Sequence, residues 1–216
     1  ASRYVVEAWR GYTKQKQFGS TLARNDWVFI LDGDEEISEP LAKQIQALTQ
    51  QTLDAHDVFL MPRRNFVLGK PVRAWWPDYQ SRLIHKERCH WPEEALHERR
   101  EASDPSRVGK LSGCLYHKRT SDAGFSDYFG GSRMDARLIP VARQMYARGK
   151  RCSVIDLIFR PWIAFWKSYL LKRGFLDGTF GLLIAQKSAV STQLKYAALW
   201  TVQNDPQRYA KQDVAG

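Results

Sequence analysis

Residues 27–36, WVFILDGDEE, decide the fold, because five apolar residues there run directly into an acidic turn. The run has the length and the β-branched and aromatic content of a buried strand, of the kind found inside a parallel sheet. Asp32 and Asp34 follow it, at the edge of an open α/β sheet where ligands bind. Ser38-Glu39-Pro40 then predicts a helix start with an N-cap, an early acid and a first-turn proline. A strand, an acidic turn and a helix indicate an α/β fold.

Working outward, the pattern predicts further elements on both sides of this unit. Residues 12–24 have the spacing of a short helix, on which Lys14, Lys16 and Arg24 are expected to be exposed. The helix that starts at Ser38 has a predicted buried stripe of Leu41, Ile45 and Leu48. Strands are predicted over residues 58–61, 82–85 and 111–117, with a hairpin or flap over 65–72 and a loop-rich stretch over 86–108.

The character of the sequence changes near residue 121, after which it reads as helical. Helices are predicted over residues 125–147, with a kink at Pro140, and over 154–172 and 182–200, with a glycine-punctuated break over 174–181. We therefore divide the chain into an α/β domain over residues 1–120 and a helical C-terminal extension over 121–216. A chain of 216 residues suits one domain with such an extension.

Composition excludes several classes of protein. A content of 12% aromatic residues excludes a solvated, disordered chain. Three cysteines are too few for a disulfide scaffold and favour a reducing compartment. The sequence has no uncharged apolar run of about 18 residues, so it predicts no plain transmembrane helix. It also begins without an initiator methionine or a signal core, from which we expect it to start inside a longer gene product.

The chain is basic, with 33 lysines and arginines against 23 acids and a net charge of +10. A basic protein suits acidic partners such as nucleic acid, anionic lipid or phosphorylated substrate. The aromatic and basic stretch 154–173 has three interpretations, which are packing against the α/β body, an interfacial helix on an anionic membrane, and a nucleic-acid platform. Its aromatic residues occur at the density of a buried helix, which disfavours the third.

Asp32 and Asp34 form a D-x-D pair that can face one divalent cation. Mg²⁺ or Mn²⁺ takes carboxylate ligands together with phosphate oxygens, and such a cation neutralises a leaving diphosphate. The alternative is an acidic loop whose Glu35 and Glu36 favour the positive end of the following helix.

Two further groups can carry acid–base chemistry. Asp78 lies in residues 75–83, WWPDYQSRL, and His97-Glu98 follows in the loop-rich stretch. Asp78 or Glu98 can deprotonate a hydroxyl as a general base, and His97 can bind metal or orient another group. The alternatives are an ion pair of Asp78 with Arg82 and a surface pair at His97-Glu98.

A zinc site is a competing interpretation of the histidines and cysteines. Cys114-x-x-His117 has tolerable spacing, but the regular paired pattern of a zinc finger is missing. The other candidate ligands are His85, Cys89, His90 and His97.

Several motifs occur in order along nearly the whole chain. They are Trp9-Arg10-Gly11-Tyr12 with Lys14-Gln15-Lys16; Asn25-Asp26-Trp27 leading into Leu31-Asp32-Gly33-Asp34-Glu35; Arg64-Asn65-Phe66-Val67-Leu68-Gly69; Pro77-Asp78-Tyr79 with Arg82-Leu83; Leu96-His97-Glu98; and Gly174-Phe175-Leu176-Asp177-Gly178 with Gly181 and Lys195-Tyr196-Ala197. Together they resemble family 2 glycosyltransferases of the lipopolysaccharide-core type, the β-1,4-glucosyltransferase-like branch.

The resemblance implies a GT-A fold, which is a Rossmann-like nucleotide-diphospho-sugar transferase domain, and it implies inversion at the anomeric carbon. It also implies a nucleotide-sugar donor, a hexose such as glucose, and a divalent metal, Mg²⁺ or Mn²⁺. Family members usually begin with about one more β-α-β unit, which holds the base and ribose of the donor. That unit has no counterpart here, so we expect a partial GT-A domain.

The resemblance also implies roles for individual residues. Asp32 faces the donor nucleotide or sugar, and Asp34 binds the metal together with Asp32. Glu98 is the first choice of catalytic base and Asp78 the second, with His97 in support. Lys14 and Lys16 are expected near the donor diphosphate, and Arg82 is expected near the donor phosphate or a phosphorylated acceptor.

The expected acceptor is a phosphorylated lipopolysaccharide-core or related glycolipid. This acceptor and the basic helical tail predict a peripheral protein on the cytoplasmic face of the inner membrane, with no nucleic-acid partner. The alternative function is a non-enzymatic basic module that binds anionic membrane or nucleic acid.

Overall fold

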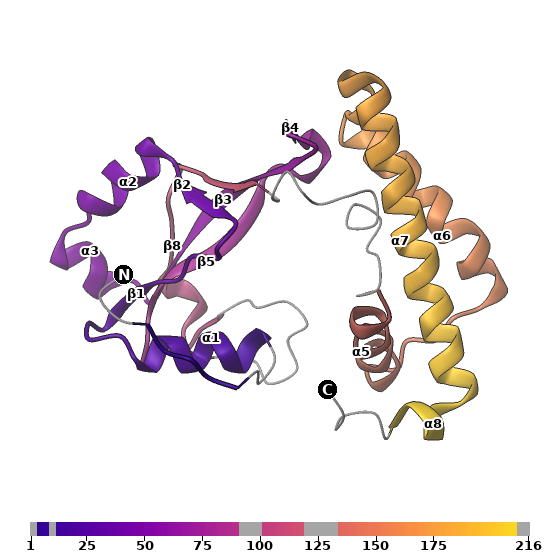
Figure 1. Ribbon diagram of the computed structural model, residues 1–216, viewed down its shortest axis with the longest axis horizontal. Helices are drawn as coiled ribbons and strands as arrows, with labels where there is room; N and C mark the ends of the chain where they lie inside the picture. The colour runs from indigo at the N-terminus through magenta and orange to yellow at the C-terminus, as the bar shows by residue number, and fades with distance from the viewer. Residues whose placement is uncertain (1–3, 9–11, 91–100, 119–133, 211–216) are drawn as a thin grey trace. The chain divides into compact units, whose positions relative to one another are not determined.

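The computed structural model describes residues 4–8, 12–90, 101–118 and 134–210 (Figure 1). The fold is mixed α/β with a helical C-terminal part, as the sequence predicts. Two compact units are present. The sheet unit comprises Ala1–Arg64 and Pro77–His117, and the helical unit comprises Asn65–Trp76 and Lys118–Gly216.

The sheet unit is built around a curled, mixed sheet in the order β1-β5-β3-β9-β2, in which β4 and β8 also pair with β3. The β3–β8 pairing is parallel, whereas β1–β5, β3–β5 and β2–β9 are antiparallel. The strands are β1 (Trp27–Phe29), β2 (Glu35–Ile37), β3 (Val58–Val67), β4 (Lys70–Pro71), β5 (Asp78–His85), β8 (Val108–Lys110) and β9 (Leu115–Lys118).

The expectation that the run at 27–31 lies inside a parallel sheet is wrong. β1 stands at one end of the described strand order and pairs antiparallel with β5, with Trp27 opposite His85. Its residues are half-buried. Trp27 and Phe29 pack into one apolar cluster, while Val28 and Ile30 pack into another. Because both faces of the strand meet apolar neighbours, the run is continuous without parallel pairing.

Helices α1 (Tyr12–Thr21), α2 (Glu39–Gln46) and α3 (Gln50–Ala55) belong to the sheet unit. The predicted start of α2 is confirmed, because Ser38 Oγ accepts a hydrogen bond from the Leu41 backbone N–H. Leu41 is fully buried in an apolar cluster that also contains Phe59 of β3. Ile45 and Leu48 pack against this cluster, so the predicted buried stripe of α2 faces the sheet. The acidic turn is shorter than predicted, since Glu35 begins strand β2.

The predicted hairpin at 65–72 is present. Leu68 and Gly69 both have positive φ, 51° and 72°, which is typical of a type I′ turn between two strands. The turn joins the end of β3 to β4, and the short helix η1 (Arg73–Trp75) follows. Val67, Val72 and Ala74 then pack with Ile184 in one cluster of the helical unit.

In the helical unit, α5 and α6 both pack against the long helix α7 (Figure 1). The described helices are α5 (Met134–Ala147), α6 (Val154–Trp166), the π-helix η4 (Lys167–Leu171), η5 (Gly174–Asp177), α7 (Gly178–Asn204) and α8 (Pro206–Ala210). Pro140 lies inside α5, and residues 125–133 of that predicted helix are outside the described residues. The predicted break over 174–181 is shorter in the structure, because η5 ends at Asp177 and α7 begins at Gly178.

Three short elements complete the sheet unit: β6 (Cys89–His90), β7 (Glu101–Ala102) and η2 (Pro105–Arg107). Within the described ranges, no helix is long and apolar enough to cross a membrane.

Candidate functional site

The first aspartate of the D-x-D pair is held by two cations. One Asp32 carboxylate oxygen lies 2.6 Å from Lys16 Nζ, and the other lies 2.6 Å from Arg82 Nη2. Burial raises the pKa of Asp32, but the hydrogen bond from Lys16 and the charges of Arg82 and Lys16 outweigh it, so the pKa lies below its ordinary value. Lys16, expected to be exposed, is therefore largely buried against Asp32.

Arg82 joins Asp32 to a second carboxylate. Its side chain is only 3% exposed, and its Nη2 lies 2.5 Å from Oε1 of Glu35, whose side chain is fully buried. Glu35 also closes the acidic turn, because its other oxygen accepts a hydrogen bond from the Asp32 backbone N–H at 3.3 Å. Glu35 is therefore an internal counter-ion. The alternative in which it serves the end of the following helix is wrong.

The ion pairs continue through Arg63 to Asp78. Arg63 Nη1 lies 2.9 Å from Oε1 of Glu35, and its Nη2 lies 2.8 Å from Oδ2 of Asp78. Burial lowers the pKa of Arg63, but Asp78 and Glu35 raise it more, so it stays above its ordinary value. Gln80 donates to the other oxygen of Asp78 at 2.7 Å. The structure thus pairs Asp78 with Arg63, and Arg82 with the two acids of the turn.

We call this connected set the ion-pair chain: Lys16, Asp32, Arg82, Glu35, Arg63 and Asp78. Its geometry follows from the sheet, because Arg63 on β3 stands directly opposite Asp78 on β5. Sequence reasoning missed Glu35 and Arg63 as members. Their types were visible, but their meeting depends on pairing between distant strands.

The second aspartate has a different partner. Asp34 is 40% exposed, and its Oδ2 lies 3.1 Å from Nε2 of His117. The contact arises because Glu35, the next residue, stands opposite His117 in the β2–β9 pairing. Sequence reasoning noted His117 only as a zinc ligand with Cys114. In the part of the chain that the structure describes, no three histidine, cysteine or acidic side chains cluster in a way that holds a metal.

The pair of Asp34 and His117 fits a divalent cation that shares its ligands with a substrate. Mg²⁺ and Mn²⁺ sites in phosphate-binding proteins use one or two protein carboxylates plus phosphate oxygens. Asp34 supplies one such carboxylate, whereas the His117 imidazole 3.1 Å from it suits a transition-metal ion such as Mn²⁺ better than Mg²⁺, which takes oxygen ligands. Asp32 is less suited, because both its oxygens already face cations.

The other predicted site residues lie outside the ion-pair chain or outside the described residues. Lys14 is exposed on α1. His97 and Glu98 lie outside the described residues.

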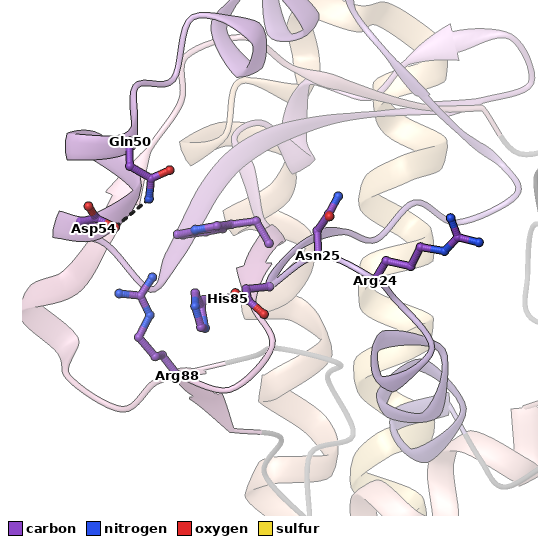
Figure 2. A pocket seen from close by; sticks show the side chains of 8 residues that line it. Arg24, Asn25, Gln50, Asp54, His85 and Arg88 are labelled. Carbon is purple, nitrogen blue, oxygen red and sulfur yellow. Dashed lines mark hydrogen bonds between the residues drawn. The ribbon is translucent and has the colours of Figure 1, made fainter.

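The opposite end of β1 and β5 carries a hollow of about 550 Å³ (Figure 2). Arg88 and His85 both contact the ring of Trp27 there, at 5.7 Å between centres. Burial and the charge of Arg88 lower the pKa of His85. Asp54 accepts a hydrogen bond from Gln50, and the hollow is completed by Arg24, Asn25 and Asp26.

Comparison with known proteins gives relatives but no matching family model. A Rickettsia felis protein described as an uncharacterized glycosyltransferase is 40% identical over 211 residues, covering 92% of this chain and 72% of the relative. A Rickettsia bellii protein with the same description is 23% identical over 214 residues, covering 92% and 69%. The lipopolysaccharide core biosynthesis glycosyltransferase LpsC of Rhizobium meliloti is 26% identical over 215 residues, covering 92% and 72%.

Proposed function

The chain belongs to a family of bacterial glycosyltransferases, and from that premise we propose that it is an inverting family 2 enzyme of the GT-A type. It moves a sugar, a hexose such as glucose, from a nucleotide-sugar donor to a lipopolysaccharide-core or related phosphorylated glycolipid. The likeness to LpsC, which is named for lipopolysaccharide core biosynthesis, supports this acceptor class. The observation that carries the proposal is the turn after β1, where a half-exposed Asp34 meets His117 beside the restrained Asp32.

Asp34 and His117 are the residues that we propose to hold Mg²⁺ or Mn²⁺. Such a cation, when bound, supplies charge neutralisation for the leaving diphosphate. Asp32 faces the donor, and its orientation is fixed by Lys16 on one oxygen and Arg82 on the other. Arg82 is buried and acts by positioning Asp32. Lys16 and the exposed Lys14 are the cations on α1 that we assign to the donor phosphates.

The acceptor hydroxyl attacks the anomeric carbon of the donor sugar. Glu98 takes the hydroxyl proton as the new glycosidic bond forms, and the bond to the nucleoside diphosphate breaks with its electron pair on the departing phosphate oxygen. Asp78 is the second choice of base. Its two oxygens already accept hydrogen bonds from Arg63 and Gln80, so a proton on either oxygen displaces one of these donors and removes the charge that pairs with Arg63.

The test is sugar transfer by the complete gene product, measured as nucleotide release across a panel of nucleotide-sugar donors. We expect Asp34→Asn and His117→Ala each to lower transfer at least about tenfold and to raise the Mn²⁺ concentration needed for half-maximal rate. The double change of Asp32 and Asp34 to alanine abolishes transfer. Glu36→Gln, one residue along from the ion-pair chain, is the matched control and leaves the rate within about twofold.

The competing function is a basic module without catalysis, which binds membrane or nucleic acid. In that case Asp32 and Asp34 are dispensable. Undiminished transfer by the double alanine variant, or no nucleotide release with any donor, contradicts the proposed enzyme. We place the enzyme peripherally at the cytoplasmic face of the inner membrane, where we expect its glycolipid acceptor.

A further inference from the structure

Helix α6 carries an unusually apolar exposed face. Trp162 is 62% exposed and Ile158 is 52% exposed, although both are large apolar side chains. We define the α6 face as the exposed apolar residues Val154, Ile155, Ile158, Phe159, Trp162, Ile163 and Trp166. At 100° per residue they cover roughly half of the helix circumference without a polar interruption. A patch of this kind marks an interaction surface.

The other side of α6 already has its partner. Pro161 is buried and Leu157 packs into the cluster that contains Leu199 of α7. The side of α6 that packs against α7 is therefore a narrower stripe than the α6 face. The α6 face has no partner among the described residues of that cluster, and the segment that follows α6 exposes four more apolar side chains: Leu170, Leu171, Phe175 and Leu176.

The charges around this face favour an anionic surface as its occupant. Residues 150–176 contain a single carboxylate, Asp156, which Arg160 engages at 2.7 Å. The six basic residues of the same stretch are Lys150, Arg151, Arg160, Lys167, Lys172 and Arg173. Tryptophan and aliphatic side chains on one face, bordered by lysine and arginine, are the composition of helices that lie in the plane of a membrane interface.

From these observations we infer that α6, η4 and η5 form an in-plane anchor that binds the surface of an anionic lipid bilayer through the α6 face. The apolar side chains enter the headgroup region, and Lys167, Lys172 and Arg173 remain at the level of the lipid phosphates. No helix of the described residues can span a bilayer, so the binding is interfacial. The inference rests on the peripheral location in the proposed function and names the residues that produce it. It needs neither donor nor acceptor, so vesicle binding and sugar transfer can fail separately.

The test is flotation of the purified chain with vesicles of phosphatidylglycerol and phosphatidylcholine in roughly equal amounts, compared with phosphatidylcholine alone. We expect binding to the anionic vesicles at low salt, weakened by salt. The double variant Ile158→Glu/Trp162→Glu reduces the affinity at least tenfold. Gln46→Glu, an exposed position on α2 in the sheet unit, adds a negative charge away from the face and leaves binding unchanged.

A second variant removes charge without touching apolar packing. Lys167→Gln/Lys172→Gln, both at exposed positions, reduces binding to anionic vesicles and flattens its salt dependence. Far-ultraviolet circular dichroism establishes that each variant is folded. Two results overturn the inference. One is no vesicle binding by the unaltered chain at low salt, in which case self-association that Ile158→Glu/Trp162→Glu abolishes would assign the α6 face to a second copy of the chain. The other is undiminished binding by folded Ile158→Glu/Trp162→Glu.

Discussion

Glu35 is the residue on which the ion-pair chain depends most. Its carboxylate is fully buried, and it contacts both Arg82 and Arg63. Two guanidinium groups near one buried site repel each other and lose hydration, so they need this shared negative charge. Removing the Glu35 carboxylate leaves Arg82 paired only with Asp32 and Arg63 paired only with Asp78. Both of these aspartates are more exposed than Glu35.

We therefore predict that Glu35→Ala lowers the free energy of unfolding by about 3 kcal/mol, as expected when one partner of a buried ion pair is removed. Urea unfolding followed by tryptophan fluorescence measures it. The neighbouring Glu36→Ala is the control, because Glu36 is exposed, and its cost is about 0.5 kcal/mol. Equal costs for the two substitutions contradict the internal role of Glu35.

The ion pairs of Asp32 are expected to make the free energy of unfolding depend on pH in the acidic range. Its pKa in the folded chain lies below the ordinary value of 3.8, so the unfolded chain takes up its proton first as the pH falls. The stabilisation from Asp32 is complete above about pH 5 and is lost as the pH drops through 3.8 towards the lower, folded pKa. We expect the stability gap between the unaltered chain and Asp32→Asn to narrow over that window.

Urea midpoints measured between neutral and acidic pH test this. Asp26→Asn is the control, since Asp26 is mostly exposed and 3.4 Å from Lys86. A gap for Asp32→Asn that stays constant with pH shows that the carboxylate is not stabilised by Lys16 and Arg82.

At the scale of single elements, much of the structure follows from local sequence. Ser38 and Pro40 place the start of α2, and Leu68-Gly69 places the hairpin turn. These signals work because capping and positive φ are decided by residues within one turn of each other. The apolar run at β1 predicted a strand correctly. The prediction of a parallel neighbour was wrong, because a strand of an antiparallel sheet also has apolar residues on both faces when both faces are covered.

The candidate site was predicted less completely. The sequence named Lys16, Asp32, Asp34, Asp78 and Arg82 as candidates, but it gave Glu35 only as an alternative charge for the following helix and did not connect Asp34 with His117. Asp34 and His117 are separated by 83 residues, and Glu35 and Arg63 by 28. Contacts at such separations depend on strand register, which the local pattern of one sequence leaves open.

The close approach of two glycines where η5 leads into α7 gives a prediction. A Cβ placed on Gly181 meets the carbonyl oxygen of Gly174 at 1.7 Å, so the backbones must separate to admit it. We expect Gly181→Ala to destabilise the helical unit by about 2 kcal/mol or more. Gly19→Ala on α1 is the control, because nothing lies within 4 Å of its Cβ, and it is neutral or stabilises by up to about 1 kcal/mol. Thermal unfolding followed by circular dichroism compares them.

At the scale of the whole molecule, the two units share a strand. β3 begins in the sheet unit, and its last residues, with the segment up to Trp76, belong to the helical unit. Along the sequence, this segment lies between Arg63 and Asp78, and Arg63 donates a hydrogen bond to the Asp78 carboxylate. Arg73 further connects the segment to Asp177 of η5 at 3.1 Å. Along the sequence, the hairpin therefore lies between two strands of the sheet unit, but its side chains pack with the helical unit.

A substitution in the hairpin tests this division of the chain. Val72 is 3% exposed and packs with Ile184 of α7. Val72→Ala removes two buried methyl groups, and we expect it to cost about 2 kcal/mol. Because its partners belong to the helical unit, hydrogen exchange of backbone amides, followed by mass spectrometry of peptides, accelerates in α7 around Ile184. Exchange in β5 around Ile84 stays near that of the unaltered chain.

Leu83→Ala is the matched control, since Leu83 is buried among Phe59, Met61 and Leu115 of the sheet unit. It is expected to accelerate exchange in β3 and β5 while α7 is unaffected. If both substitutions accelerate exchange equally in the two units, the chain unfolds as one cooperative body. Separate responses instead mean that the two units open independently, and that residues 65–76 open together with the helices rather than with the strand that carries Arg63.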